Sequence, residues 1–209
     1  MISLQRLKHR LQGFRADGET FENQDLRSAN AYGSQFLNCK FVNCKMNLMN
    51  FDAATLVDCE FLGCTGLLSQ FRVAPKMRNV YFEDCDLEQA NFAAANMDGV
   101  NFKNCRLAQS NFEKAIVVGV VFQESNLRGA DLRFHISKGI SFENCNLWGA
   151  QVALGCQFFN GTFDVDTVGK FVAMAARLYP HGDDRETLEE IAGVNMKVVD
   201  RLMRDREDE

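Results

Sequence analysis

Large apolar residues recur at every fifth position along most of the chain. Between Ala90 and Lys114 the units read ANFAA, ANMDG, VNFKN, CRLAQ and SNFEK, each with a large apolar residue in third place. A small or apolar residue opens each unit, and the last two places are mostly polar or small. This period matches neither the 3.6 residues of an α-helix nor the two of a strand. A short period kept over a long span indicates a repeat architecture.

The five-residue units fall into groups of four, because the same large residue returns about every twenty positions. Phe41 and Phe61 are 20 residues apart, whereas Phe61 and Phe82 are 21 apart. One residue is therefore inserted, and the change of phase places it between Phe71 and Met77. Four such columns predict four sides per turn, with the first and third residues of each unit facing inwards. The predicted structural core is Phe41, Phe61, Phe82, Phe102, Phe122 and Phe142, with Cys85 and Cys105 at small inward positions.

The pattern resembles the pentapeptide repeat family, whose units approximate A-(D/N)-L-x-x. ADLRF at Ala130 and SNLRG at Ser125 match this unit closely, and the resemblance covers roughly Phe21 to Val152. It implies an all-β solenoid, a right-handed four-sided β-helix, with about seven turns in a chain of this length. Because one solenoid fold serves many roles, the resemblance predicts the fold much better than the function.

Both ends of the chain depart from the five-residue period. We expect residues 1–20 to form a short N-terminal cap helix with a lead-in, because terminal repeats need caps. A basic docking or membrane-surface helix is the alternative reading of this segment. The β-helix is predicted over residues 21–164, and a C-terminal helical hairpin with a charged tail over residues 165–209.

The predicted hairpin has two apolar stripes to bury. It can cap the last turn or pair with a second copy, and the resemblance offers the second option because quinolone-resistance members of the family dimerise through C-terminal elements. The sequence leaves cap and homodimer open. The cap or dimer candidates are Val168, Phe171, Leu188, Ile191, Val198 and Leu202.

Eight cysteines raise the question of a metal site or disulfides. They fall at the small inward position of the units, with no C-x-x-C pair and no accompanying histidine cluster. We therefore interpret them as small buried residues that stay reduced. No metal and no cofactor are expected.

Two irregular segments, 71–78 and 133–139, lie on the side with the loosest column. The first contains Pro75 and three cations, and in the second His135 takes a small inward position and Ser137 a large one. We expect the two segments on one side, three turns apart. They are either tolerated bulges or a partner-binding patch, since bulges re-aim side chains. The candidate partner-binding residues are Arg72, Lys76, Arg78, Phe134, His135 and the outward-facing Trp148.

The sequence does not favour an enzyme. The three histidines are scattered over a predicted cap, a bulge and a loop. No catalytic triad, metal-ligand or glycine-rich phosphate motif has a credible context. A filled interior also leaves none of the concave pockets that ligands prefer. The chain is therefore interpreted as non-catalytic.

Charge bears on the best-known function of the resembled family. Some members resemble duplex DNA and bind DNA gyrase or topoisomerase IV, whose DNA site is basic and attracts an acidic surface. Residues 21–152 carry 14 acidic and 12 basic residues, and most of the acidic excess lies beyond them. The solenoid thus lacks an evident anionic stripe. Direct binding of nucleic acid is not expected either.

The function predicted from the sequence is a protein-interaction scaffold with an unidentified protein partner. The alternative is a DNA-mimicking modulator of gyrase or topoisomerase IV. No apolar run approaches the roughly 20 residues that span a bilayer, so no membrane span is expected. The N-terminus lacks the apolar core of a signal peptide, which predicts a cytoplasmic protein, with export as an effector through a receptor-read signal left open.

Overall fold

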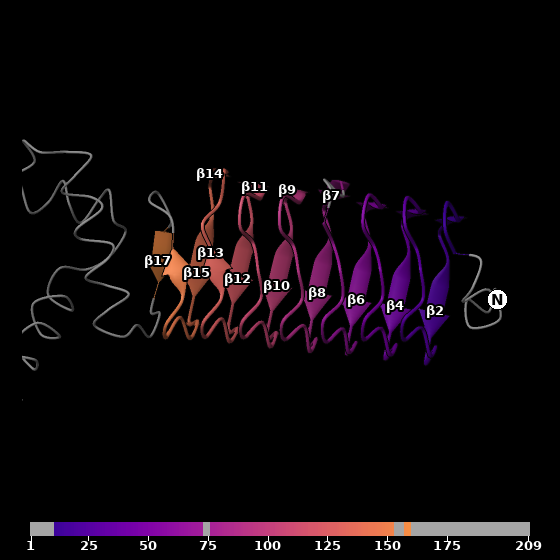
Figure 1. Ribbon diagram of the computed structural model, residues 1–209, viewed down its shortest axis with the longest axis horizontal. Coiled ribbons are helices and arrows are strands. Elements are labelled where there is room, and N and C mark those ends of the chain that lie inside the picture. Colours follow the sequence, from indigo (N-terminus) through magenta and orange to yellow (C-terminus); the bar gives the residue numbers. More distant parts are fainter. Residues whose placement is uncertain (1–10, 73–75, 153–156, 160–209) are drawn as a thin grey trace, which may run out of the picture.

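The protein is a rod-shaped parallel β-solenoid (Figure 1). The computed structural model describes residues 11–72, 76–152 and 157–159. The predicted four-sided β-helix is confirmed. The predicted helical hairpin lies outside the described residues, as does most of the predicted cap helix. The described residues contain no helix with the length and hydropathy needed to cross a membrane.

Two sides of the solenoid carry regular strands. In the seven-stranded sheet, strands pair in the order β1 (Arg15–Asp17), β3 (Gln35–Leu37), β5 (Thr55–Val57), β7 (Lys76–Arg78), β9 (Asn96–Asp98), β11 (Ile116–Val118) and β14 (Ile136–Lys138). In the eight-stranded sheet the order is β2 (Thr20–Glu22), β4 (Lys40–Val42), β6 (Glu60–Leu62), β8 (Tyr81–Glu83), β10 (Asn101–Lys103), β12 (Val121–Gln123), β15 (Ser141–Glu143) and β17 (Gln157–Phe159).

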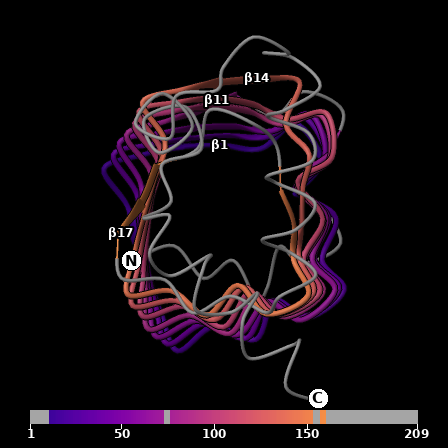
Figure 2. The ribbon, with the colours of Figure 1, turned by 90° about the vertical axis from the view of Figure 1, so that its left-hand side faces the viewer.

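Shorter contacts make the other two sides. On the third side, isolated parallel bridges run from Asp25 to Asn146, and on the fourth from Asn30 to Asp131. The fourth side ends with the pair β13 (Asp131–Leu132) and β16 (Gln151–Val152). Viewed along the rod, the turns superimpose as a square with a right-handed path (Figure 2).

The register locates the inserted residue. Asn50 pairs with Gln70, a step of 20, whereas Thr55 pairs with Lys76, a step of 21. The extra residue therefore enters between Gln70 and Lys76, as the change of phase predicts. From Lys76 onwards the step returns to 20, because Lys76 pairs with Asn96.

Each corner needs a residue in the left-handed backbone region, which explains the small and polar ends of the units. The residue two places after the buried column residue has a positive φ at 26 corners, from Gly13 to Gly149. On the third and fourth sides the corner is closed by a hydrogen bond such as Ala90 N–H to the Leu87 carbonyl, 3.0 Å. Residues Leu87 to Ala90 form a type II turn, because this hydrogen bond closes it and its third residue, Gln89, has a positive φ.

The second residue of many units has a separate role on the third and fourth sides. The Asn111 side-chain carbonyl accepts the backbone N–H of Glu113 at 2.8 Å, and Asn91 does the same for Ala93 at 3.0 Å. These hydrogen bonds hold the backbone in the conformation in which it enters the corner. They explain why asparagine or aspartate recurs there. The residues in this role are Asp25, Asn30, Asn50, Asp86, Asn91, Asn111, Asn126, Asp131 and Asn146.

Two phenylalanine ladders fill the interior. Phe82 and Phe102 stack at 4.9 Å between ring centroids, and Phe92 and Phe112 stack at 4.7 Å. The ladders meet edge to face, as between Phe82 and Phe92 at 81°. Both arrangements are favourable for aromatic pairs. The residues expected in the core are all buried: Phe41, Phe61, Phe82, Phe102, Phe122, Phe142, Cys85 and Cys105.

One unit lacks its large inward residue. In the unit that begins at Cys64 the column position is Gly66, which is buried. A Cβ atom on Gly66 would lie 2.8 Å from a methyl group of Leu87 in the next turn. The Leu87 side chain therefore occupies the space that a larger residue would fill.

Candidate interaction surface

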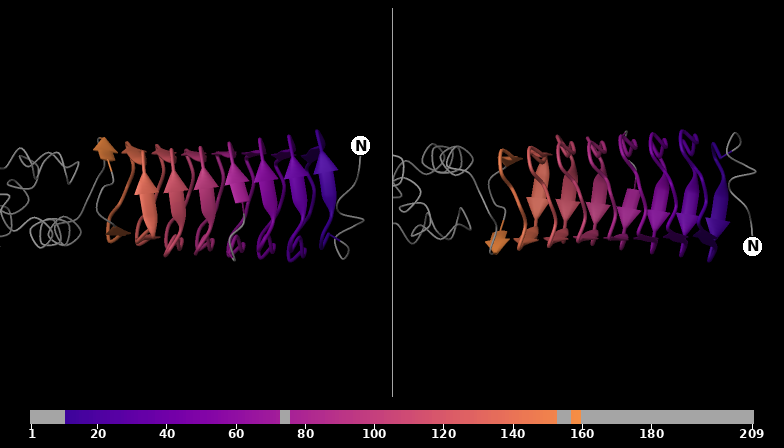
Figure 3. Two further views of the ribbon diagram at one scale, coloured as in Figure 1. Left: turned by 90° about the horizontal axis from the view of Figure 1, so that it is seen from above. Right: turned by 90° about the horizontal axis from the view of Figure 1, so that it is seen from below.

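The outward side of the seven-stranded sheet is the candidate site, and we call it the seven-stranded face. Its strands lie side by side along the rod (Figure 3, left). In each strand the central residue points inwards and its two neighbours point outwards, as the alternation of a β-strand requires. This is the side with the loosest column. Strands β7 and β14 of the two irregular segments lie three strands apart on it, as predicted.

The ion pairs of the rod lie elsewhere. On the eight-stranded side, Lys103 contacts Glu83 at 3.0 Å, and on the third side Arg106 contacts Glu88 at 2.9 Å. Within residues 11–72 and 76–152, no ion pair involves a strand of the seven-stranded face. The exposed cations of this face, such as Lys76 and Arg78, are therefore available to a partner. The acidic members of the ion pairs are Asp25, Asp52, Glu60, Glu83, Asp86, Glu88, Glu113 and Asp131.

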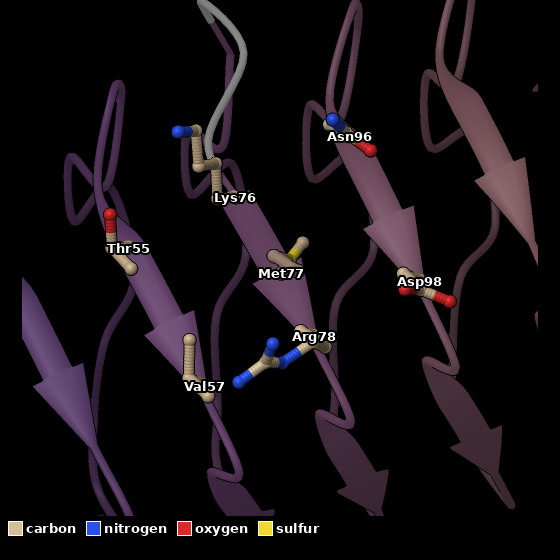
Figure 4. A pocket seen from close by; sticks show the side chains of 7 residues that line it. All are labelled: Thr55, Val57, Lys76, Met77, Arg78, Asn96 and Asp98. Carbon is tan, nitrogen blue, oxygen red and sulfur yellow. The ribbon is translucent and has the colours of Figure 1, made fainter.

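An open depression of about 290 Å³ lies in the middle of the face. Lys76 and Arg78 from β7 line it, and Figure 4 shows Arg78 directed towards Val57 on β5 and away from Asp98 on β9. Two cations with no ion pair in the described part of the chain thus sit beside one carboxylate. This arrangement suits an anionic group. The complete lining is Thr55, Val57, Lys76, Met77, Arg78, Asn96 and Asp98.

Exposed aliphatic side chains lie at the C-terminal end of the face, beside the exposed Lys138. Val118 on β11 and Ile136 on β14 are exposed, and their strands pair directly. The neighbouring corner consists of stacked glycines, where a Cβ added to Gly119 would lie 3.9 Å from the Gly99 backbone. Because these glycines have no side chains, another protein can approach the backbone closely beside the exposed aliphatic groups.

The predicted inward position of His135 is wrong. His135 is exposed, and the half-buried Phe134 packs against the core, with its ring centroid 6.3 Å from that of Phe112. Phe134 stands at the corner position that elsewhere has a positive φ, which is costly for an aromatic residue. The chain turns early instead, with Phe134 N–H bonded to the Leu132 carbonyl at 3.0 Å, and His135 faces outwards.

The remaining sequence candidates are separated by the fold. Arg72 makes an ion pair with the buried Asp52 at 3.0 Å, at the corner before the face. Trp148 is exposed at the corner between the third and fourth sides, away from the face. Lys76 and Arg78 are thus brought together, and Phe134 and His135 lie near the C-terminal end of the face. The cap or dimer candidates, Val168, Phe171, Leu188, Ile191, Val198 and Leu202, lie outside the described residues.

Sequence reasoning missed the aliphatic part of the face. Val118 and Ile136 flank the column positions 117 and 137, so their outward direction follows from the period itself. What the sequence did not reveal was the distribution of ion pairs, because those depend on which side chains meet between turns.

The cysteines that the structure describes form neither a disulfide nor a metal-binding group. The seven in the described ranges are free and buried, and no group of three metal-ligating side chains occurs among the described residues. Six of these thiols donate a hydrogen bond to a carbonyl of the preceding turn, as Cys85 does to Phe61 at 3.3 Å, and Cys39 donates to Leu37 in its own turn. Burial raises the pKa of the Cys145 thiol to about 11, so it is un-ionised near neutral pH. Cys156 lies outside the residues that the structure describes.

Comparison with protein families gives a match to part of the chain. A family model described as a pentapeptide repeat region matches residues 75–152. Those residues are therefore a pentapeptide repeat region, and the resemblance seen in the sequence is confirmed. The comparison with curated protein sequences gives no match.

Solved structures of pentapeptide repeat proteins are similar to the chain. Full-length QnrB1, a plasmid-mediated fluoroquinolone resistance protein, is 20% identical, with a TM-score of 0.35 and coverage of 81% of this chain and 92% of QnrB1. HetL from the cyanobacterium Nostoc sp. strain PCC 7120, involved in heterocyst differentiation regulation, is 14% identical, with a TM-score of 0.33 and coverage of 74% and 86%.

Proposed function

We propose that the protein is a non-catalytic scaffold that binds a partner protein through the seven-stranded face. One observation carries this proposal. Among the described residues, most cations on the other sides are ion-paired, whereas Lys76 and Arg78 are not. Unpaired charge next to exposed aliphatic groups is the composition of a recognition surface, with the apolar part giving affinity and the charges giving specificity.

The interior supports a non-catalytic role. It is filled by stacked phenylalanine rings at 4.7–4.9 Å rather than by a ligand cavity. We also propose a cytoplasmic location, which suits the seven free thiols because reducing compartments keep cysteines unpaired.

A crosslinking experiment tests the choice of face. A photoreactive phenylalanine analogue replaces Asn96, exposed beside the depression, or Lys40, exposed on the eight-stranded side. We expect a discrete crosslinked protein from host extract at position 96 and not at position 40, with the yield lowered by Arg78→Glu. Equal crosslinking from both positions, or no effect of Arg78→Glu, contradicts the proposal.

Modulation of DNA gyrase or topoisomerase IV is the alternative function, which the resemblance to the pentapeptide repeat family offers. It demands an anionic surface, yet eight of the 14 acidic residues between positions 21 and 152 are ion-paired. A gyrase supercoiling titration with and without a quinolone separates the two functions. Inhibition or drug protection at low protein concentration favours the alternative, and no effect favours the scaffold.

A further inference from the structure

Four exposed residues of the seven-stranded face follow one another in register along the rod. Arg78 on β7 pairs with Asp98 on β9, Asp98 pairs with Val118 on β11, and Val118 pairs with Lys138 on β14. All four side chains point outwards. We call this row the 78–138 column, and its order along the rod is cation, anion, aliphatic group, cation.

In the described part of the chain, the lysines and arginines that form no ion pair lie mainly on the seven-stranded face. The outward positions of its strands hold two carboxylates, Asp17 and Asp98, so the face has a positive net charge. Complementary charge steers encounter and selects among partners, so a partner surface of negative charge is expected. The cations without an ion pair are Arg15, Lys76, Arg78 and Lys138 on the face, and Lys45 and Arg128 on the third side.

The position of Asp98 restricts the kind of acidic partner that fits. Asp98 lies directly between Arg78 and Val118 in the 78–138 column. A nucleic-acid backbone or an anionic lipid surface carries negative charge throughout, so it would place like charge against Asp98. A protein segment can instead place a basic or polar residue there. The column therefore favours a protein segment with acidic residues at defined places.

The spacing of the column matches the rise of an α-helix. Neighbouring strands lie about 4.8 Å apart, so Asp98, Val118 and Lys138 follow Arg78 at about 4.8, 9.6 and 14.4 Å along the rod. Residues three, seven and ten places along an α-helix lie about 4.5, 10.5 and 15 Å further along its axis, and all on one side of it. An extended segment returns to the same side every 6.6 Å or about that, which does not follow the column.

We propose that the partner presents an amphipathic α-helix that lies along the rod on the 78–138 column. This inference rests on the proposed function and specifies the partner. One acidic residue of the helix contacts Arg78 beside Lys76, and a second one, ten places away, contacts Lys138. Between them a basic or polar residue faces Asp98, and an aliphatic residue packs on Val118. The corners that follow β9, β11 and β14 are glycines, so no side chain there obstructs the helix.

Synthetic helical peptides test the pattern. Two fluorescein-labelled peptides of about 16 residues, or about 24 Å of helix, carry it in an alanine background, one for each direction along the rod. A third peptide has the same residues in an order that scatters them around the helix. With the full chain, we expect fluorescence anisotropy to show about tenfold tighter binding of one patterned peptide than of the scattered peptide. In about 1 M salt, where the screening length is about 3 Å, this preference should fall.

Charge reversal tests the register. Lys138→Glu should weaken the patterned peptide about tenfold, and a peptide with lysine in place of the facing glutamate should restore binding, which also shows that the variant is folded. The control is Arg128→Glu, which reverses an exposed cation on the third side and should have no effect. Equal binding of patterned and scattered peptides, no binding of either, no effect of Lys138→Glu or no rescue overturns the inference. A DNA duplex or anionic lipid vesicles bound in preference to the peptides overturn it as well.

The two experiments on the face have separable outcomes. Crosslinking at positions 96 and 40 tests the choice of face, whereas the peptides test the helix and its register. A crosslink confined to position 96, together with peptides that do not bind, supports the proposed function and overturns the helix. Equal crosslinking from both positions contradicts the proposed function and the inference together.

Discussion

At the scale of single residues, backbone conformation decides which side chains suit the corners. The left-handed region costs an ordinary residue roughly 1–2 kcal/mol relative to glycine, and asparagine tolerates it better than most. Asn104 and Gly119 therefore fit their corners, whereas Lys114, at a φ of 61°, does not. At Phe134 the backbone avoids the left-handed region instead, because the chain turns earlier than at the other corners.

We expect Lys114→Asn to stabilise the protein by about 1 kcal/mol, because it relieves the left-handed backbone conformation. Lys114 is exposed, and its ion pair with Glu113 at 3.1 Å contributes little at the surface. Thermal unfolding should show a midpoint higher by about 2–4 °C. Lys114→Val serves as the control, since a β-branched residue is still less suited to this region, and a higher midpoint for it contradicts the argument.

The raised pKa of the buried Cys145 thiol predicts that the folded protein loses stability at alkaline pH. Burial raises the pKa of Cys145 from its ordinary 9.0 to about 11, so the folded state holds the proton more tightly than the unfolded state. This contribution to stability is complete below pH 9 and is lost as the pH rises towards 11. Urea unfolding at a series of pH values should show the decline, and Cys145→Ala should make it shallower. An identical pH dependence in both proteins contradicts the assignment.

At the scale of elements, the units differ by side even though their sequences look alike. On the third and fourth sides the second residue accepts a backbone N–H at the corner, as Asn111 does. On the eight-stranded side Asn101 stands at the same place in its unit, yet its buried Oδ1 has no hydrogen-bond partner. The same residue type thus closes a corner on one side and has no such role on another.

Asn111→Ala is expected to lower the free energy of unfolding by about 1 kcal/mol, because the Glu113 N–H loses its acceptor. Asn111→Asp keeps the acceptor and should change stability much less. The matched control is Asn96→Ala on the seven-stranded face, where the asparagine is exposed. Chemical denaturation of the three variants measures the difference. An equal loss for Asn96→Ala would mean that the corner bond is not the cause.

Most of the element structure was predictable because it depends on a local period. The columns, the four sides and the inserted residue before Lys76 all follow from spacing alone. The exchange of Phe134 and His135 did not follow, since it depends on a backbone conformation that one aromatic residue disfavours. The sequence predicted the cations of the seven-stranded face. It did not predict which charged residues form ion pairs, because those pairs depend on which side chains meet between turns.

At the scale of the whole molecule, stability comes from contacts between neighbouring turns. Phe102 stacks on Phe82 at 4.9 Å and on Phe122 at 4.9 Å, so one ring joins three turns. The buried apolar residues that the structure describes form one continuous cluster along the rod, as expected for a solenoid. A defect in the middle of the rod therefore affects both halves.

Phe102→Ala should cost about 3–5 kcal/mol, because it removes a buried ring and leaves a cavity between two stacked neighbours. Lys103→Ala, one residue away on the outward side, should change stability little, since its contact with Glu83 is solvent-exposed. Urea unfolding followed by circular dichroism compares the two. Similar effects for both variants would show that the inward and outward positions have been misassigned.

The regular spacing of the stacked rings also sets the distance between successive turns along the rod. Successive rings are 4.7–4.9 Å apart, and twenty residues return the chain to the same side. Gain or loss of one whole turn between two surfaces therefore changes their separation by about one ring spacing and keeps each surface on its own side of the rod. The residue inserted before Lys76 does not disturb this scale, because the ladder continues from Phe71 to Phe92 at 4.8 Å across it. The separation of two surfaces on this rod can therefore change only in discrete steps.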